Sequence, residues 1–319
     1  MALLVRVTAM YLLAGGLFVA VFRDNPLDLL GRIFEALPGS LALFMDLAWW
    51  VMPVFAGMFV LAPWRTLVAR LPQAITAIFL CTLFFLVFTL IKTSLPYAVG
   101  FWADPLMARL DQALHFGTSP WALAHRYADW VNLKWAGNIY FGFWLVPALY
   151  TPVLLILFDD DAARKKRFLL LYFFVWIGLG NVLALAFMSA GPVFYDRLLD
   201  SDTFSGLTAA LKASGVRDSG IGMAQERLWH IYATGSQEAG SGISAFPSVH
   251  IGMVTLLALY LGERSRWLAL PGAVMVGVFV FLSVFLGWHY AVDGYASIIA
   301  VSLAWWGLRR YERRPGKPA

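Results

Sequence analysis

Long apolar runs constrain this chain more than any other feature of its sequence. Eight of them are present, at roughly 4–22, 41–62, 73–91, 138–158, 168–188, 248–263, 267–287 and 289–307. A helix needs about 20 mostly apolar residues to cross the hydrocarbon core of a bilayer. We therefore predict an all-α fold, a polytopic transmembrane helical bundle of about eight spans, in which six core spans are possible.

The overall composition supports a membrane protein and excludes a water-soluble one. Of the 319 residues, 61% are hydrophobic and 13% are charged, whereas soluble domains carry about 45–50% apolar and about 25% charged residues. No internal repeat and no low-complexity linker divides the chain. We therefore interpret residues 1–319 as a single integral membrane domain.

The basic residues predict how the bundle is oriented, because cytoplasmic loops of membrane proteins are enriched in Lys and Arg. If the N-terminus is cytoplasmic, 14 of the 24 basic residues fall on short inside segments, and the other 10 are spread over three outside loops. We expect both termini in the cytoplasm and an even number of spans. The net charge of +5 then follows from topology, and no basic face with aromatic residues predicts nucleic-acid binding.

Two segments between spans are long enough to hold structure of their own. Residues 92–137 contain "DPLMARLDQALHFG", in which apolar residues recur at helical spacing. We expect short helices at the membrane interface here, with Asp104 as an N-cap and Pro105 at the first helical position. The alternative is an ordinary loop. Residues 189–247 form the second segment, which leads directly to the first of two notable histidines.

The first histidine, His250, follows a proline and a serine at the start of an apolar run, in "GISAFPSVHIGM". Pro247 fits the first turn of a helix, where its missing N–H costs nothing. The free N–H groups of that turn, among them that of Val249, and the positive end of the helix dipole favour an anion. Ser248 adds a hydroxyl. The pattern therefore predicts a phosphate site within reach of His250.

The second histidine, His289, lies 39 residues further on, in "LGWHYAVDGY". The spacing places His289 and Asp293 at i and i+4, on one face of a helix. A carboxylate that holds one ring nitrogen leaves the other as an acceptor, which is the orienting half of a nucleophile arrangement. If the chain crosses the membrane once after 248 and returns, both histidines lie at the same face. The alternative is a structural His–Asp pair.

The pair of motifs "FPSVH" and "HYAVD" resembles the type 2 phosphatidic acid phosphatase superfamily. The closer resemblance is to its inositolphosphotransferase-like branch, which includes fungal inositol phosphorylceramide synthase. It covers 190–300 best, so we place the catalytic motifs there, and it is looser over 100–160, where "DPLMARLDQAL" is also similar to the branch.

The resemblance implies a role for each residue of the two motifs. His289 would attack phosphorus and give a phosphohistidine, Asp293 would orient His289, and His250 would protonate the leaving oxygen. Ser248 and nearby backbone N–H groups, such as that of Val249, would bind the phosphoryl oxygens. No cofactor and no metal ion is expected, because these donors would hold the charge of the transition state.

The chain departs from the superfamily in its basic residues. The wider superfamily has a Lys-x6-Arg-Pro motif, which is missing here, and an Arg at the position of Ser283. Another cation must therefore face the phosphorus. We expect Tyr195 and Arg197, in "GPVFYDRL", to contribute to the phosphate site. Further candidates are Arg227 and His230, and Arg197 could equally be an ordinary surface arginine.

Taken together, the sequence predicts a membrane-embedded lipid phosphatase or phosphotransferase in the plasma or inner membrane, with its active site at the outer face. Its partners would be a lipid phosphate and, for transfer, an alcohol or lipid acceptor. Two alternatives stay open. A transporter would show paired halves and broken helices, which the sequence lacks, and the missing basic residues would suit a catalytically silent relative.

Overall fold

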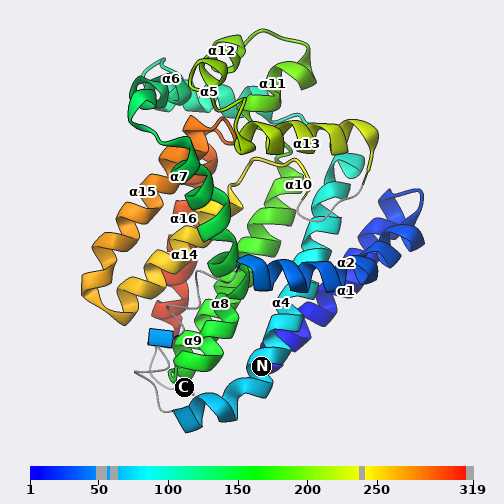
Figure 1. Cartoon of the computed structure of the whole chain (residues 1–319), viewed down its shortest axis with the longest axis vertical. Coiled ribbons are helices and arrows are strands. Elements are labelled where there is room, and N and C mark those ends of the chain that lie inside the picture. The colour runs from blue at the N-terminus through cyan, green and yellow to red at the C-terminus, as the bar shows by residue number, and fades with distance from the viewer. Residues whose placement is uncertain (48–55, 58–63, 237–240, 314–319) are drawn as a thin grey trace.

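The computed structural model describes residues 1–47, 56–57, 64–236 and 241–313 (Figure 1). Every regular element in these residues is a helix, and none is a strand. The predicted all-α class is therefore confirmed.

Six helices in the described residues are long and apolar enough to cross a membrane. The shortest has 20 residues and the longest 35, so each meets the length that a bilayer requires. The protein is therefore an integral membrane protein built on a polytopic bundle. The six are α1 (Ala2–Phe22), α4 (Trp64–Ala98), the two composite helices Leu133–Phe158 and Ala162–Ala186, η5 with α15 (Arg266–Phe285), and α16 (Ala291–Glu312).

The two composite helices each contain a π-helical segment. The first consists of α7 (Leu133–Gly137), the π-helix η3 (Asn138–Phe143) and α8 (Trp144–Phe158). The second consists of α9 (Ala162–Phe173), the π-helix η4 (Phe174–Leu183) and α10 (Ala184–Ala186). Such segments are rare and frequently occur at functional sites.

A further apolar helix, α14 (Val249–Arg264), has 16 residues and packs against α15 (Ala269–Phe285) and α16. It corresponds to the predicted span at 248–263. The predicted span at 41–62 overlaps the end of α2 (Pro26–Leu47), and its residues 48–55 and 58–62 lie outside the described part of the chain.

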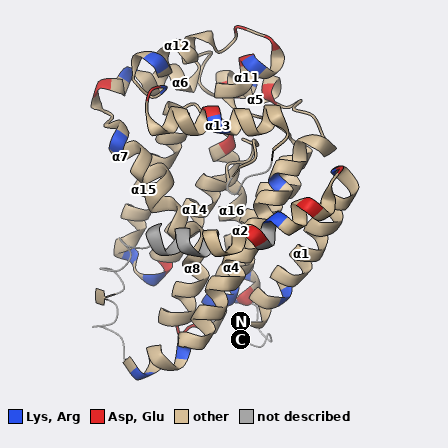
Figure 2. Cartoon of the chain, turned by 45° about the vertical axis from the view of Figure 1, so that its right-hand side comes forward, with Lys and Arg blue, Asp and Glu red and all other residues tan. Residues whose placement is uncertain are grey.

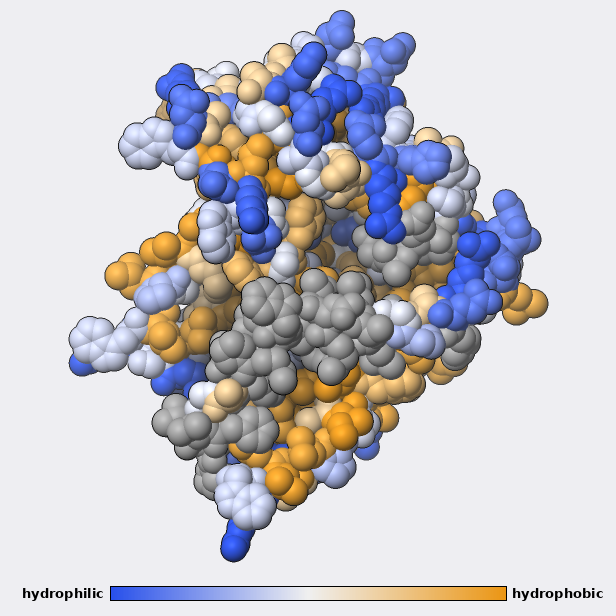
Figure 3. All heavy atoms as spheres, viewed as in Figure 1, coloured by the Kyte–Doolittle hydropathy of each residue, from blue (hydrophilic) through white to orange (hydrophobic). Residues whose placement is uncertain are grey.

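Short helices gather at one end of the bundle and form what we call the cap (Figure 1). The N-terminus and the last turns of the C-terminal helix, α16 (Ala291–Glu312), lie at the opposite end. Charged residues concentrate in the cap and at that opposite end (Figure 2), and hydrophobic residues dominate the flanks below the cap (Figure 3). The cap helices are α5 (Asp104–Leu114), α6 (Pro120–Ala124), η2 (His125–Trp130), α11 (Pro192–Leu199), α12 (Ser205–Ala213) and α13 (Gly220–Thr234).

Ion pairs fasten the spans together at the end opposite the cap. Asp159 is fully buried and accepts two hydrogen bonds from Arg164, at 2.7 and 2.5 Å. Arg167 of α9 pairs with Glu263 of α14 and Glu312 of α16. Breaking a buried pair by removing one partner costs about 3–5 kcal/mol, so these contacts hold the three helices in place from below.

Candidate active site

The start of α14 is built around Ser248. Ser248 is the N-cap of α14, and its Oγ accepts a hydrogen bond from the Ile251 N–H at 3.4 Å. The expectation that Pro247 occupies the first turn is wrong, because the helix begins at Val249. The N–H groups of Val249 and His250 have no hydrogen-bond partner within the described chain. They remain available to an anion.

The residues before α14 are held on two sides. The N–H groups of Ala245 and Phe246 donate to the carbonyl and the hydroxyl of Ser189, at 2.8 and 3.0 Å. Gly242 has a φ of +111°, and a Cβ there would lie 2.9 Å from Cγ of Lys92 on α4. Only glycine combines this conformation with so close an approach. The segment therefore runs directly over Lys92 before α14 begins.

His289 lies between Ser248 and Asp293. Its Nδ1 is 3.2 Å from Oδ2 of Asp293, and its Nε2 is 3.2 Å from Oγ of Ser248. The same Oδ2 accepts the Tyr290 N–H at 3.1 Å. His289 and Asp293 do not share a helix face as expected, because α16 begins only at Ala291. Asp293 instead reaches back from the first turn, and its hydrogen bond holds Nδ1 while Nε2 faces the serine.

His250 stacks on two aromatic rings. Its ring centroid lies 3.8 Å from that of Trp144 and 4.6 Å from that of Tyr140, with interplanar angles of 17° and 7°. The His250 and His289 rings are 6.3 Å apart. Neither ring nitrogen of His250 bonds to another described residue. The stacking fixes the plane of the ring while its nitrogens stay available for proton transfer.

Asp111 of α5 supports the helix that follows His289. Its two carboxylate oxygens accept the N–H groups of Ala291 and Val292, at 2.9 and 2.8 Å. These are orphan donors of the first turn of α16, which a helix leaves without an internal partner. Burial raises the pKa of Asp111, and the two backbone hydrogen bonds partly offset this rise. A carboxylate from the cap therefore serves as the N-terminal cap of a span.

Asp104, on the same helix as Asp111, also accepts hydrogen bonds from two backbone N–H groups. It is the first residue of α5 rather than its N-cap, which corrects the expectation from sequence. Its oxygens accept the N–H groups of Ala190 and Gly191, at 2.8 and 2.9 Å, and the hydroxyl of Tyr290 at 3.0 Å. Sequence analysis missed both carboxylates as site supports. Their spacing of seven residues, on one face of a helix, was the available signal.

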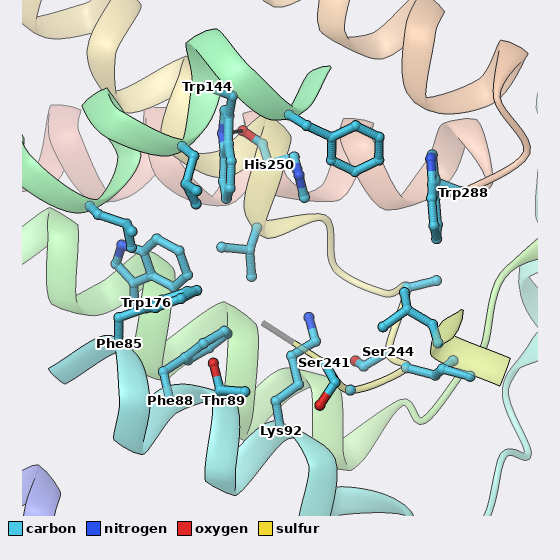
Figure 4. Close-up of a pocket in the computed structure, with 18 of the residues that line it drawn as sticks. Phe85, Phe88, Thr89, Lys92, Trp144, Trp176, Ser241, Ser244, His250 and Trp288 are labelled. Carbon is cyan, nitrogen blue, oxygen red and sulfur yellow. Dashed lines mark hydrogen bonds between the residues drawn. The ribbon is translucent and has the colours of Figure 1, made fainter. Parts of the chain in front are cut away.

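Both histidines border a cavity of about 350 Å³, and Figure 4 shows His250 at its wall. His250, His289 and Val249 lie on its wall, together with Lys92 of α4. Figure 4 shows the Lys92 amine pointing into the cavity, on the side of Ser241 and Ser244. The cavity thus brings a cation and both histidines together on one wall.

Lys92 was missed by sequence analysis because the predicted span ended at residue 91. Two polar residues, Thr93 and Ser94, follow it, yet the helix continues to Ala98. Their hydroxyls donate to the carbonyls of Thr89 and Leu90, at 3.0 and 2.8 Å, which is how polar side chains are accommodated inside a span. An ionisable residue within a span is a functional candidate by default, and this was the signal that could have found it.

Lys92 has no carboxylate partner among the described residues. Its amine lies 5.6 Å from the Phe88 ring centroid. Burial, and then the positive charge of Lys92, lower the pKa of His289 to about 3. A neutral imidazole keeps a lone pair on one nitrogen, so His289 is in the form that a nucleophile requires.

Tyr195 and Arg197 do not line this cavity, contrary to expectation. Tyr195 is buried and packs on Phe204, with ring centroids 4.9 Å apart. Arg197 forms an ion pair with Glu226 and lies over the Trp229 ring, 5.5 Å from its centroid. The predicted cation therefore belongs to the cap, and Lys92 takes the place beside the histidines.

The arrangement agrees with the comparison to known protein families. The model of the PAP2 superfamily matches residues 105–307, more than half of the chain, and this stretch contains both histidine motifs. No curated protein and no solved structure matches the chain. Membership suggests a phosphatase- or phosphotransferase-type function. With the family match and the two histidine motifs in one fold, the chain belongs to the PAP2 superfamily.

Proposed function

We propose that the protein is a lipid phosphatase or phosphotransferase that works through a phosphohistidine on His289. One observation carries this proposal above all: Nε2 of His289 faces Ser248 while Asp293 holds Nδ1. His250 and Lys92 share the same cavity. A nucleophile, an orienting carboxylate, an acid and a cation are the groups that phosphoryl transfer through histidine needs.

In the first step, the Nε2 lone pair of His289 forms a bond to phosphorus while the bond from phosphorus to the leaving oxygen breaks. His250 gives its proton to that oxygen, which leaves as an alcohol. Asp293 stabilises the positive charge that develops on the His289 ring. Lys92, Ser248 and the free N–H groups at the start of α14 stabilise the charge on the phosphoryl oxygens.

In the second step, an acceptor hydroxyl loses its proton to His250 while its oxygen bonds to phosphorus. The bond between phosphorus and Nε2 breaks, and the electron pair returns to His289. Water as the acceptor makes the protein a phosphatase. An alcohol or lipid acceptor makes it a phosphotransferase, the reaction expected of the inositolphosphotransferase-like branch.

We also propose that the cap and the site lie at the outer face of the plasma or inner membrane, with both termini cytoplasmic. The basic residues at the end opposite the cap support this orientation. The last turns of α14 and α16, at that end, hold Arg264, Arg309 and Arg310.

The test compares a labelled lipid phosphate with an activated aryl phosphate, each with and without an alcohol acceptor. His289→Ala should lose its activity on both substrates, because the atom that bonds phosphorus is gone. His250→Ala should lower turnover of the lipid by about 10²–10⁴-fold, the typical contribution of a proton donor. Its turnover of an aryl ester should fall much less, because that leaving group needs no proton. Arg197→Ala, whose side chain pairs with Glu226 outside the cavity, is the matched control.

Each outcome has a defined meaning. Label trapped on the wild type after an alkaline quench, but not on His289→Ala, supports the phosphohistidine. If His289→Ala still cleaves the aryl ester while His250→Ala does not, the two roles are reversed. Full activity of both variants on the lipid would reject the proposed chemistry. The products formed with the alcohol present separate hydrolysis from transfer.

A further inference from the structure

The cavity beneath the histidines continues far into the bundle. Along α4 its wall runs from Lys92 through Thr89 and Phe85 to Thr82. Ten residues of α-helix span about 15 Å at 1.5 Å each, which is about half of a bilayer's hydrocarbon core. The histidines occupy only one end of this space, so most of the cavity needs another explanation.

Between the histidine end and the hydroxyls of Thr82 and Tyr150, most of the wall is built from large apolar side chains. Phe85 and Phe88 come from α4, Leu149 from α8 and Trp176 from the π-helix η4 (Figure 4). The other π-helix, η3, contributes Tyr140 beside His250. Both π-helical segments thus face this one cavity, as expected if they are kept for a functional purpose.

The hydroxyls at the far end of the cavity are hydrogen-bonded. Oγ of Thr82 donates to the carbonyl of Ile78 at 2.9 Å and lies 2.8 Å from Oη of Tyr150. An apolar cavity of this kind does not hold water stably, because water needs two to four polar partners. An empty one forfeits the contacts that its lining atoms would make. The occupant that suits the walls is therefore a hydrocarbon.

We propose that this chamber takes up a single hydrocarbon chain of the phosphorylated substrate, inside the protein rather than in the surrounding bilayer. The inference rests on the proposed function, because the phosphate at Lys92 and the histidines would be the group that anchors the chain. A volume of about 350 Å³ is near the lower end of ligand pockets, which suits one chain and not two. The substrate class is thus a long-chain alkyl, acyl or isoprenoid phosphate with one chain in the chamber.

The test measures binding without turnover. Alkylphosphonates from ethyl to tetradecyl, used as monomers, are titrated by calorimetry into the full-length protein in detergent. Each added methylene should tighten Kd by about three- to fourfold, the factor expected for burying one CH₂ group. The gain should end at the chain length that reaches Thr82.

Two variants locate the chain. Thr89→Phe narrows the chamber midway, so Kd for octylphosphonate should weaken by about tenfold or more, while Kd for ethylphosphonate should stay within about twofold. Thr76→Phe makes the same change on the same helix at an exposed position and should behave as the wild type. Thr82→Leu fills only the far end of the chamber, so it should weaken Kd for the longest chains alone. This variant replaces Thr89→Phe in the test if Thr89→Phe does not fold.

The inference and the proposed function fail in different ways. The inference is overturned if Kd does not tighten with chain length. It is also overturned if Kd tightens with chain length in Thr89→Phe and Thr82→Leu as much as in the wild type, because the chain then lies elsewhere. If chain-dependent binding is found but no phosphoester is turned over, the inference stands and the proposed chemistry fails. If the wild type binds none of the phosphonates, both are rejected.

Discussion

At the scale of single residues, one positive charge governs the electrostatics of the site. Lys92 shares the cavity with His250 and His289 and faces no carboxylate among the residues that the structure describes. Its charge makes protonation of His289 less favourable. A phosphate group, with a charge of about −1.5 to −2 at neutral pH, would compensate Lys92 on binding. The free site is thus a cationic pocket with a neutral His289, the proposed nucleophile.

We predict that Lys92→Met lowers kcat/KM for an aryl phosphate by about 100-fold or more, the scale of losing one main transition-state donor. The same change should raise the pKa of His289 from about 3, because a repelling charge is removed. The pKa should stay below the usual 6.5, since burial is the larger cause. NMR titration of histidine-labelled protein reads the pKa directly, and Arg197→Met is the control for both measurements.

The low pKa of His289 makes the folded protein less stable at acidic pH. His289 in the unfolded chain binds a proton below about pH 6.5, whereas in the folded chain it does so only near 3. The free energy of unfolding therefore falls through this window as the pH drops. An unchanged His289 titration in Lys92→Met would show that the lysine does not face the ring.

At the scale of elements, helix α5 acts as a brace across the site. Asp104 fixes the 190–191 turn and Tyr290, and Asp111 caps the start of α16. Both residues therefore hold the part of the chain that directly follows His289. Neither carboxylate lines the cavity, so we class both as positioning residues.

We predict that Asp111→Ala lowers kcat for lipid and aryl substrates alike, by about tenfold or more, because misplacing a reacting group by about 1 Å can cost about 100-fold. It leaves two buried N–H groups without a partner, each costing about 1–3 kcal/mol, so Tm should fall too. Asp111→Asn keeps one acceptor oxygen, so it should restore part of the lost kcat and part of the lost Tm. Arg109→Ala, exposed on the same helix, should change neither; equal effects in both variants would remove the bracing role.

Local signals predicted most of the helices and the residues of the two motifs. The apolar runs predicted α1, α4, α15 and α16, and Ser248 stands at a helix start as its sequence context indicates. Contacts between distant parts of the chain had no such signal, because the partners of Asp111 lie 180 residues away. Lys92 was missed for a different reason. The hydroxyl groups of Thr93 and Ser94 donate to carbonyls of their own helix, but in the sequence two polar residues after an apolar run are typical of the start of a loop.

At the scale of the whole molecule, we predict that the cap faces outward. A reporter fused after Ala163, at the end opposite the cap, should read cytoplasmic, and one inserted near Ser214, in the cap, should read outside. Cysteine accessibility in intact cells gives an independent measurement. A cytoplasmic signal at Ser214 would place the histidines on the inner face and change the source of the substrate.

The direction of two helices links this orientation to the chemistry. Both α14 and α16 begin at the site and run away from it, and their last turns carry Arg264, Arg309 and Arg310. The positive end of the α14 dipole therefore lies where an anion would bind, whereas the Asp111 carboxylate offsets the positive end of α16. Cationic side chains compensate the negative ends of both helices. The arginines proposed to orient the protein during insertion would thus also stabilise the helix whose start is proposed to attract the phosphate. One helix, α14, would then carry both a charge that sets the topology and the dipole that acts on the site.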